Sequence, residues 1–230
     1  MRPRWGYGGP CLLVVVAACA PTSAGRTTVP GTTQPVRASS SPATSGPASG
    51  PVRIVVTVER QAHDAATKDF SAVVRATLSD PRGWQAAGFQ FVFADDAPYR
   101  IVLAEGPDVD RLCRPYDVGG RFSCQNGPVV ALNAARWRTA TREWTGDLDS
   151  YRRMLVNHEV GHLLGQHHPT TQCPQPGRPA PVMAQQSTEL DGCQPNPWPL
   201  PWELHCATRH HEPIAPGYED HPTGQCEPGP

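Results

Sequence analysis

The sequence predicts an α+β domain over residues 52–199, and three observations lead to that fold class. A continuous β-branched run at 52–58 is typical of a strand buried on both faces. Apolar residues at helical spacing follow between residues 64 and 78. Two further runs, at 89–93 and 99–103, have the composition of strands. We therefore expect a sheet that packs against helices, followed by an irregular end.

Boundary signals separate these elements. Asp64 or Thr67 is expected to cap the first helix. The tripeptide at 81–83, Pro-Arg-Gly, predicts a turn before the strand at 89–93. Residues 122–132, interrupted by Asn-Gly-Pro at 126–128, are expected to add more sheet, and the edge of the sheet is a candidate position for them.

A second helix is predicted to begin near Asp147 and to end near Gly165. Residues 147–150 offer the side chains that cap a helix start. A glycine just after the last periodic residue can adopt the left-handed conformation that reverses the chain. Four residues recur at spacings of four, three and four and so share one helix face: Tyr151, Leu155, His158 and His162.

The first 18 residues resemble an export signal. Arg2 and Arg4 precede an apolar run at 12–18, which is far shorter than the ~20 apolar residues that a membrane-spanning helix needs. Residues 16–19 fit a bacterial lipobox that is cut before Cys19, and residues 18–20 also fit the small-x-small site of ordinary signal peptidase. We favour the lipobox, which predicts a lipid anchor on Cys19 at the outer face of the cell membrane, with secretion as the alternative.

Two segments flank the domain. Residues 19–51 consist almost wholly of Pro, Thr, Ser, Ala and Gly after Cys19, which predicts a disordered linker that holds the domain away from the membrane. A plain spacer is the alternative. Residues 200–230 are interpreted as a Pro-rich tail.

The cysteines agree with export. Six remain after the signal and Cys19 are set aside, and an even number in an exported chain indicates disulfides. The sequence allows many pairings, but local pairs would close short loops that have little other support. A cysteine-rich zinc cluster is disfavoured because no Cys-x-x-Cys occurs. The expected pairs are Cys113 with Cys124, Cys173 with Cys193, and Cys206 with Cys226.

A metal-binding pattern lies on the second helix. His158, Glu159 and His162 form the motif H-E-x-x-H, whose histidines stand one turn apart and can bind one ion through Nε2. Gly165 marks the helix end from which the chain can swing His168 back as a third ligand. The pattern predicts one zinc ion on His158, His162 and His168. Glu159 is placed to take a proton from a water on that ion.

This histidine motif resembles that of the metzincin clan of zinc peptidases, in which a methionine turn follows beneath the metal. Residues 181–183 look like that turn and give Met183 this role, with a gap-filling core methionine as the alternative. The spacing favours His168 over its neighbour His167. Some clan members carry a tyrosine two residues after the methionine, and Gln185 stands at that position here.

A closer resemblance is to an uncharacterised family of exported actinobacterial metzincin-like lipoproteins. It is carried by residues 157–162, 179–183 and 193–199 and covers roughly 52–199. It implies a twisted mixed sheet, an active-site helix below the sheet, and a substrate cleft along the sheet edge. The C-terminal part is expected to be irregular and stapled by disulfides.

The resemblance implies a zinc-dependent endopeptidase that acts outside the cytoplasm with Glu159 as general base. An extended substrate would lie antiparallel to the sheet edge. The main alternative is a non-catalytic cell-surface binding lipoprotein that keeps zinc as a structural staple, and a metal-scavenging lipoprotein is a third. Glu159 favours the peptidase, because a structural zinc site has no use for a carboxylate that is not a ligand.

The expected partners follow from charge and motif. The chain has 20 basic and 21 acidic residues, a net charge of −1, so it has no electrostatic footprint for nucleic acid or for an anionic membrane. We expect a peptide or protein substrate and no nucleic-acid partner. Membrane contact is expected only through Cys19, and the protein is expected to be a monomer.

Overall fold

The computed structural model describes residues 50–209. The predicted signal peptide, Cys19, the linker up to residue 49 and Cys226 lie outside the described residues. Within residues 50–209, no helix is both long enough and apolar enough to cross a bilayer. The elements, in chain order, are β1 (Val52–Arg60), the 3₁₀ helix η1 (Ala65–Thr67), α1 (Phe70–Leu78), the 3₁₀ helix η2 (Trp84–Ala87), β2 (Phe89–Phe93), β3 (Tyr99–Ala104), α2 (Gly106–Leu112), β4 (Cys124–Asn126), β5 (Val129–Asn133), α3 (Ala134–Thr139), α4 (Leu148–Leu163) and α5 (Pro201–Arg209).

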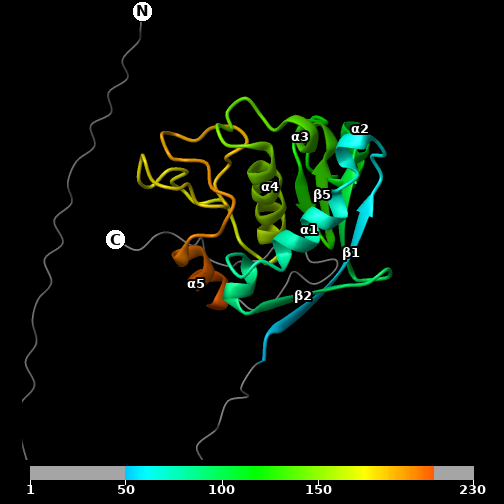
Figure 1. Ribbon diagram of the computed structural model, residues 1–230, viewed down its shortest axis with the longest axis horizontal. Coiled ribbons are helices and arrows are strands. Elements are labelled where there is room, and N and C mark those ends of the chain that lie inside the picture. The colour runs from blue at the N-terminus through cyan, green and yellow to red at the C-terminus, as the bar shows by residue number, and fades with distance from the viewer. Residues whose placement is uncertain (1–49, 210–230) are drawn as a thin grey trace, which may run out of the picture. The chain divides into compact units, whose positions relative to one another are not determined.

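The strands form one mixed sheet in the order β2-β1-β3-β5-β4 (Figure 1). β1 pairs in parallel with β2 and β3, and β3 pairs in parallel with β5. β4 is an edge strand that pairs antiparallel with β5. Gly127, with φ of 51°, lies in the short turn between them. The predicted α+β fold class is confirmed, and the interrupted segment at 122–132 is the edge hairpin.

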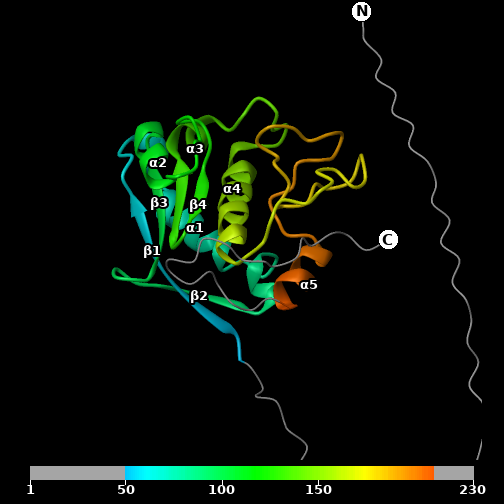
Figure 2. The ribbon, with the colours of Figure 1, turned by 180° about the vertical axis from the view of Figure 1, so that it is seen from behind.

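Alternate residues of the central strands contribute to two apolar clusters, because successive side chains of a strand point to opposite faces. Ile101 and Leu103 of β3 belong to the main core, which the sheet shares with α1 and α4. Val102 and Ala104 belong to a smaller cluster with Val109 of α2. Figures 1 and 2 show α4 beside the sheet from both sides of the molecule.

β1 differs from the expectation of a strand buried on both faces. Ile54 and Val56 are fully buried, but Val55 between them is only half-buried. The smaller apolar cluster is built by β3, β5, α2 and a disulfide, and includes no residue of β1. One face of β1 therefore lacks a full apolar cover.

The first predicted helix is divided into η1 and α1. Asp64 caps η1, since its Oδ1 accepts a hydrogen bond from Ala66 N at 2.8 Å. The hydroxyl of Thr67 donates to Ala62 O at 2.7 Å and is buried. Thr67 thus belongs to this cap, and the regular helix begins only at Phe70.

α5 extends the folded part beyond the predicted boundary at residue 199. Proline is favoured at a helix start, where its missing N–H has no partner to lose, and α5 begins at Pro201. Ala207 lies in the main core, and Leu204 packs against it. α5 also packs against η2. The segment interpreted as the beginning of a tail is therefore part of the domain up to residue 209.

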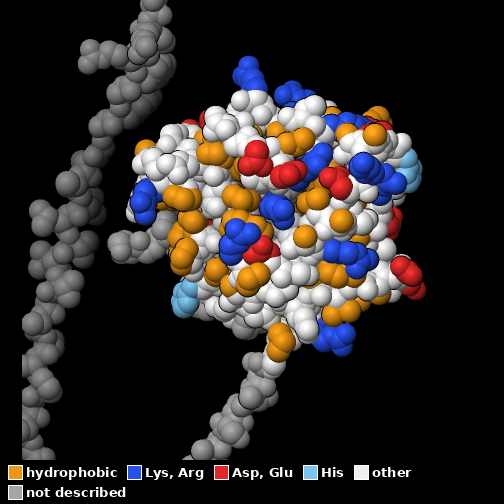
Figure 3. Space-filling model, in the orientation of Figure 1, with side chains coloured by type: hydrophobic (Ala, Val, Ile, Leu, Met, Phe, Trp, Pro, Cys, Tyr) orange, Lys and Arg blue, Asp and Glu red, His pale blue; other side chains and the backbone are white. Residues whose placement is uncertain are grey.

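The surface carries charges of both signs. On the face seen in Figure 3, basic and acidic side chains are interspersed with small apolar ones. This mixture matches the nearly balanced composition of the chain. That face therefore presents no large region of a single charge.

Candidate metal centre and active-site cleft

Helix α4 carries the first two histidines of the motif. Asp147 caps the helix by accepting a hydrogen bond from Ser150 N at 2.7 Å. His158 and His162 are four residues apart, so their imidazoles lie one turn apart on one face. Beyond the helix end, Gly165 has φ of 77°, the left-handed conformation that reverses the chain.

The reversed chain returns His168 to the helix. The Nε2 atoms of His158 and His162 are 3.3 Å apart. The Nε2 of His168 lies 3.2 Å from that of His158 and 3.1 Å from that of His162. A tetrahedral zinc ion with bonds of about 2.0–2.1 Å needs nitrogen ligands about 3.4 Å apart. The three nitrogens therefore fit one face of a zinc site.

The two helix histidines are oriented by backbone carbonyls. His158 Nδ1 donates to Val182 O at 2.9 Å, and His162 Nδ1 donates to Gln166 O at 2.8 Å. Because a carbonyl oxygen only accepts, Nδ1 carries the proton and Nε2 presents a lone pair. Burial lowers the pKa of His158 to about 4 and holds the pKa of His162 well below its ordinary value. Burial also lowers the pKa of His168.

Glu159 lies in the same site without a hydrogen-bond donor among the described residues. It is 5 % exposed and lines the cleft beside the histidines. Burial raises the pKa of its carboxyl group to about 8. A buried carboxylate normally has partners, because leaving it unpaired costs free energy. A positive charge nearby favours the ionised form, so the three-histidine cluster would suit Glu159 once it holds a cation.

Met183 packs against α4 at Gly161, the residue before His162. A Cβ atom at position 161 would clash with Met183 Sδ and would lie 2.8 Å from Trp84 Cζ2. Ala184 N donates to Pro181 O at 3.1 Å, which closes a turn at 181–184. This turn is the one whose Val182 carbonyl orients His158. The structure thus places the predicted methionine turn directly against the metal-site helix.

Sequence reasoning missed Glu203, which holds this turn from α5. Its carboxylate accepts hydrogen bonds from Val182 N at 3.0 Å, Met183 N at 2.9 Å and Leu200 N at 2.7 Å. The residue is 1 % exposed, and burial raises its pKa to about 7. Pro201 could have signalled the helix, but nothing local indicates what Glu203 binds.

A cleft of about 610 Å³ opens beside the histidines. It is bounded by α4, by Cys124 and Gln125 of the edge strand β4, and by residues 185–188. Tyr151, interpreted from the sequence as a core residue, is fully buried and also lines this cleft, where its hydroxyl lies 2.9 Å from Ser187 Oγ.

Two predicted neighbours of the metal site lie apart from the ligand cluster. His167 is exposed and does not join the three histidines, although it borders the cleft. Gln185 is exposed at the cleft, and its backbone N donates to Gln172 Oε1 at 2.6 Å. No tyrosine therefore stands at the position that some metzincins use.

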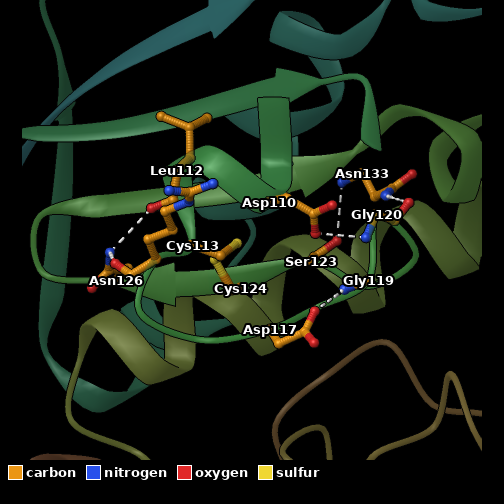
Figure 4. The surroundings of a disulfide bond; sticks show 11 residues. Asp110, Leu112, Cys113, Asp117, Gly119, Gly120, Ser123, Cys124, Asn126 and Asn133 are labelled. Carbon is orange, nitrogen blue, oxygen red and sulfur yellow. Dashed lines mark hydrogen bonds between the residues drawn. A yellow bond between two sulfur atoms is a disulfide. The ribbon is translucent and has the colours of Figure 1, made fainter. Parts of the chain in front are cut away.

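The structure contains two of the predicted disulfides. One joins Cys113 to Cys124, next to the edge strand (Figure 4). The other joins Cys173 to Cys193 and encloses the segment with Met183. The predicted partner of Cys206 lies outside the described residues, so that pair stays a prediction.

Comparison with known proteins identifies the family of the chain. Residues 27–201 match the family described as "Protein of unknown function (DUF3152)", and the chain belongs to this family. No curated protein matches the sequence. Among solved structures, archaemetzincin from Methanopyrus kandleri is similar with a TM-score of 0.44 and 12 % sequence identity, over 69 % of this chain and 96 % of that one.

Proposed function

We propose that this member of the DUF3152 family is a zinc-dependent endopeptidase that acts outside the cytoplasm on peptide or protein substrates. One zinc ion would be held by His158, His162 and His168, with Glu159 as general base. The observation that carries the proposal is the buried carboxylate of Glu159, which lacks a hydrogen-bond donor among residues 50–209 and lies in an open cleft beside three converging ring nitrogens. Strongly perturbed groups of this kind cluster at functional sites.

The chemistry divides between the ion and the chain. Zinc, when bound, polarises the scissile carbonyl and lowers the pKa of water towards about 7. The Glu159 carboxylate takes the proton of the attacking water and returns it to the leaving amine nitrogen. The edge strand β4 borders the cleft through Cys124 and Gln125, so an extended substrate can add to it by main-chain hydrogen bonds.

The alternative is a binding lipoprotein in which zinc acts only as a structural staple. Structural zinc sites usually have four protein ligands. In residues 50–209 the ligand cluster comprises three histidines, and a cleft opens next to it. These features favour the open position that a catalytic site needs.

Export and membrane attachment belong to the same proposal. Disulfides persist in oxidising compartments and are rare in the cytosol, and the pairs Cys113–Cys124 and Cys173–Cys193 support an extracytoplasmic location. We propose that Cys19 carries the lipid anchor and that the protein acts as a monomer at the outer face of the membrane.

Zinc content and peptidase activity test the catalytic proposal. The wild type and Glu159→Gln are expected to hold one zinc per chain, while Glu159→Gln loses about 10²- to 10⁴-fold in cleavage of an unfolded protein. His162→Ala is expected to lose zinc as well. Glu189→Gln, an exposed change on the segment after Met183, is the matched control and should behave as the wild type. Wild-type activity in Glu159→Gln would refute the proposal.

Cell fractionation tests the membrane attachment. Cys19→Ala is expected to release the protein from the membrane fraction into the medium, because a stable lipid anchor needs the cysteine thiol. An unchanged membrane fraction for this variant would contradict the anchor and leave the catalytic proposal untouched.

A further inference from the structure

One end of the cleft lies away from the histidines, towards the start of α4. Tyr151 precedes His158 by seven residues, which corresponds to about 10 Å along the helix axis. Four residues that line the cleft form what we call its distal end: Phe122, Arg136, Tyr151 and Ser187. Arg136 and Tyr151 both line this end. Burial raises the pKa of Tyr151, the Ser187 hydrogen bond and the charge of Arg136 lower it, and the charges of Glu159 and Glu143 raise it.

Arg136 has no carboxylate partner in the described part of the chain. The ion pairs there involve other arginines, and none includes Arg136. Its Nε donates to Arg121 O at 2.9 Å, and its Cζ lies 5.9 Å from the centre of the Phe122 ring. A guanidinium has five N–H donors, so donors remain for a ligand.

A second positive charge lies beside Phe122 of the distal end, and the nearby carboxylate of Glu143 does not line the cleft and is paired with Arg142. Arg121 has its Cζ 5.6 Å from the Phe122 ring and is also absent from the ion pairs of residues 50–209. Among the described residues that line the cleft, Glu159 is the only carboxylate, and it lies beside the histidines. The electrostatic complement of this end is therefore an anion.

The loop with Arg121 and Phe122 is held in place (Figure 4). The disulfide between Cys113 and Cys124 closes it. Gly120 N donates to Asp110 Oδ1 at 2.6 Å. A site that is already ordered loses less conformational entropy when a ligand binds.

We propose that the distal end binds a carboxylate of the substrate through Arg136. The inference rests on the proposed peptidase activity and names its substrate class: peptides with a negative charge on one side of the scissile bond. An extended chain covers about 3.3–3.6 Å per residue, so about 10 Å corresponds to roughly three residues. The carboxylate comes from an acidic side chain within three residues of the cleaved bond or from a free C-terminus at that distance. Arg–carboxylate pairs can be bidentate, which makes this recognition directional.

Fluorogenic peptides with single Glu-to-Gln exchanges at the three positions on either side of the cleaved bond test the preference. A second set compares a free C-terminus with its amide, which separates the two sources of the carboxylate. For the wild type we expect kcat/KM to be about tenfold higher for the charged member of one pair. Arg136→Gln should abolish this ratio, Arg136→Lys should keep part of it, and the exposed control Arg142→Gln should keep all of it.

A binding measurement separates this inference from the proposed function. The zinc-loaded Glu159→Gln protein is titrated with the same peptides, and the charged member is expected to bind about tenfold more tightly. The double variant Glu159→Gln/Arg136→Gln should bind the charged and uncharged members of each peptide pair with equal affinity. Cleavage by the wild type without a charge preference, or a preference that persists in folded Arg136→Gln, would overturn the inference and leave the peptidase in place. Absence of both cleavage and binding would overturn both.

Discussion

The part of the chain from β1 to α4 and the part after α4 are stabilised in different ways. In the first part, paired strands and helices bury apolar side chains such as Ile54, Phe70 and Leu103 completely. In the second part, residues 164–200 contain no helix or strand. Buried polar side chains bind backbone groups there instead.

Gln186 and Asn196 show how the second part is held. Gln186 Nε2 donates to Pro181 O at 3.0 Å and to Asn196 O at 2.9 Å. Asn196 Nδ2 donates to Ala180 O at 2.8 Å and to Trp198 O at 2.7 Å. An irregular segment cannot pair its backbone groups with neighbouring strands, so amide and carboxylate side chains satisfy them.

The candidate metal centre is built from both parts. The regular part supplies His158 and His162 at a fixed spacing on α4. The irregular part supplies His168, and its turn at 181–184 orients the His158 ring. Regular structure sets the spacing of two candidate ligands, and the polar network positions the turn beside them.

The largest expected effect comes from Glu203→Ala. This change leaves two buried backbone N–H groups, of Val182 and Met183, and the partly buried N–H of Leu200 without an acceptor, at about 1–3 kcal/mol for each buried group. We expect the free energy of unfolding to fall by about 4 kcal/mol or more and zinc affinity to fall with it. Denaturant unfolding and chelator competition measure the two quantities. Glu189→Ala, an exposed change on the irregular part, is the control, and a loss below about 1 kcal/mol in Glu203→Ala would contradict the role given to the carboxylate.

The two disulfides provide a matched comparison between the parts. Replacing either pair by alanines is expected to lower the free energy of unfolding by about 3 kcal/mol, because the loops that they close are of similar size. Only loss of Cys173–Cys193 should also weaken zinc binding, since that loop contains Met183. Equal zinc affinity in both double variants would mean that the metal centre does not depend on the irregular part.

Stability should depend on pH through Glu203. Burial raises its folded-state pKa from 4.5 to about 7, so between these values the unfolded chain releases a proton that the folded chain keeps. Its contribution to stability is therefore largest below pH 4.5 and is lost as pH rises to about 7, by at most roughly 3 kcal/mol. The measurement is the difference in unfolding free energy between the metal-free wild type and Glu203→Gln from pH 4.5 to 8. The unfolding free energy of the wild type relative to Glu203→Gln should fall as pH rises, and a rise with pH would contradict the prediction.

Gly161→Ala should have the smallest effect of the four. The added methyl group meets Met183 Sδ and Trp84 Cζ2, and such overpacking costs about 1–3 kcal/mol. Alanine recovers about 1 kcal/mol of helix propensity, so we expect a net loss of about 1–2 kcal/mol in thermal or denaturant unfolding. Gly50→Ala, where a Cβ atom meets nothing within 4 Å, is the control. A stabilised Gly161→Ala would show that the turn moves away freely.

Local patterns predicted the strands, the helix that carries two of the histidines and all three candidate ligands, but they did not predict α2 or α3. The strands, the cap at Asp147 and the reversal at Gly165 follow from side-chain periodicity and from conformational preferences of single residues. The spacing of His158 and His162 follows from the helix repeat. The expected domain boundary at residue 199 lies too early in the chain, because α5 has only a weak helix signal in its own sequence. Its packing against η2 stabilises this helix in the folded protein.

The sequence by itself determined the α+β class and the histidine motif, and it favoured the two local cysteine pairs that the structure contains, because each depends on residues close together in the chain. Only the tertiary structure decided the strand order, the contact between Glu203 and the turn at 181–184, and the place of Arg136 in the cleft. These features depend on contacts between residues far apart in the sequence. Neither the periodicity nor the spacing of residues in the sequence predicts such contacts, because they form only when the chain folds.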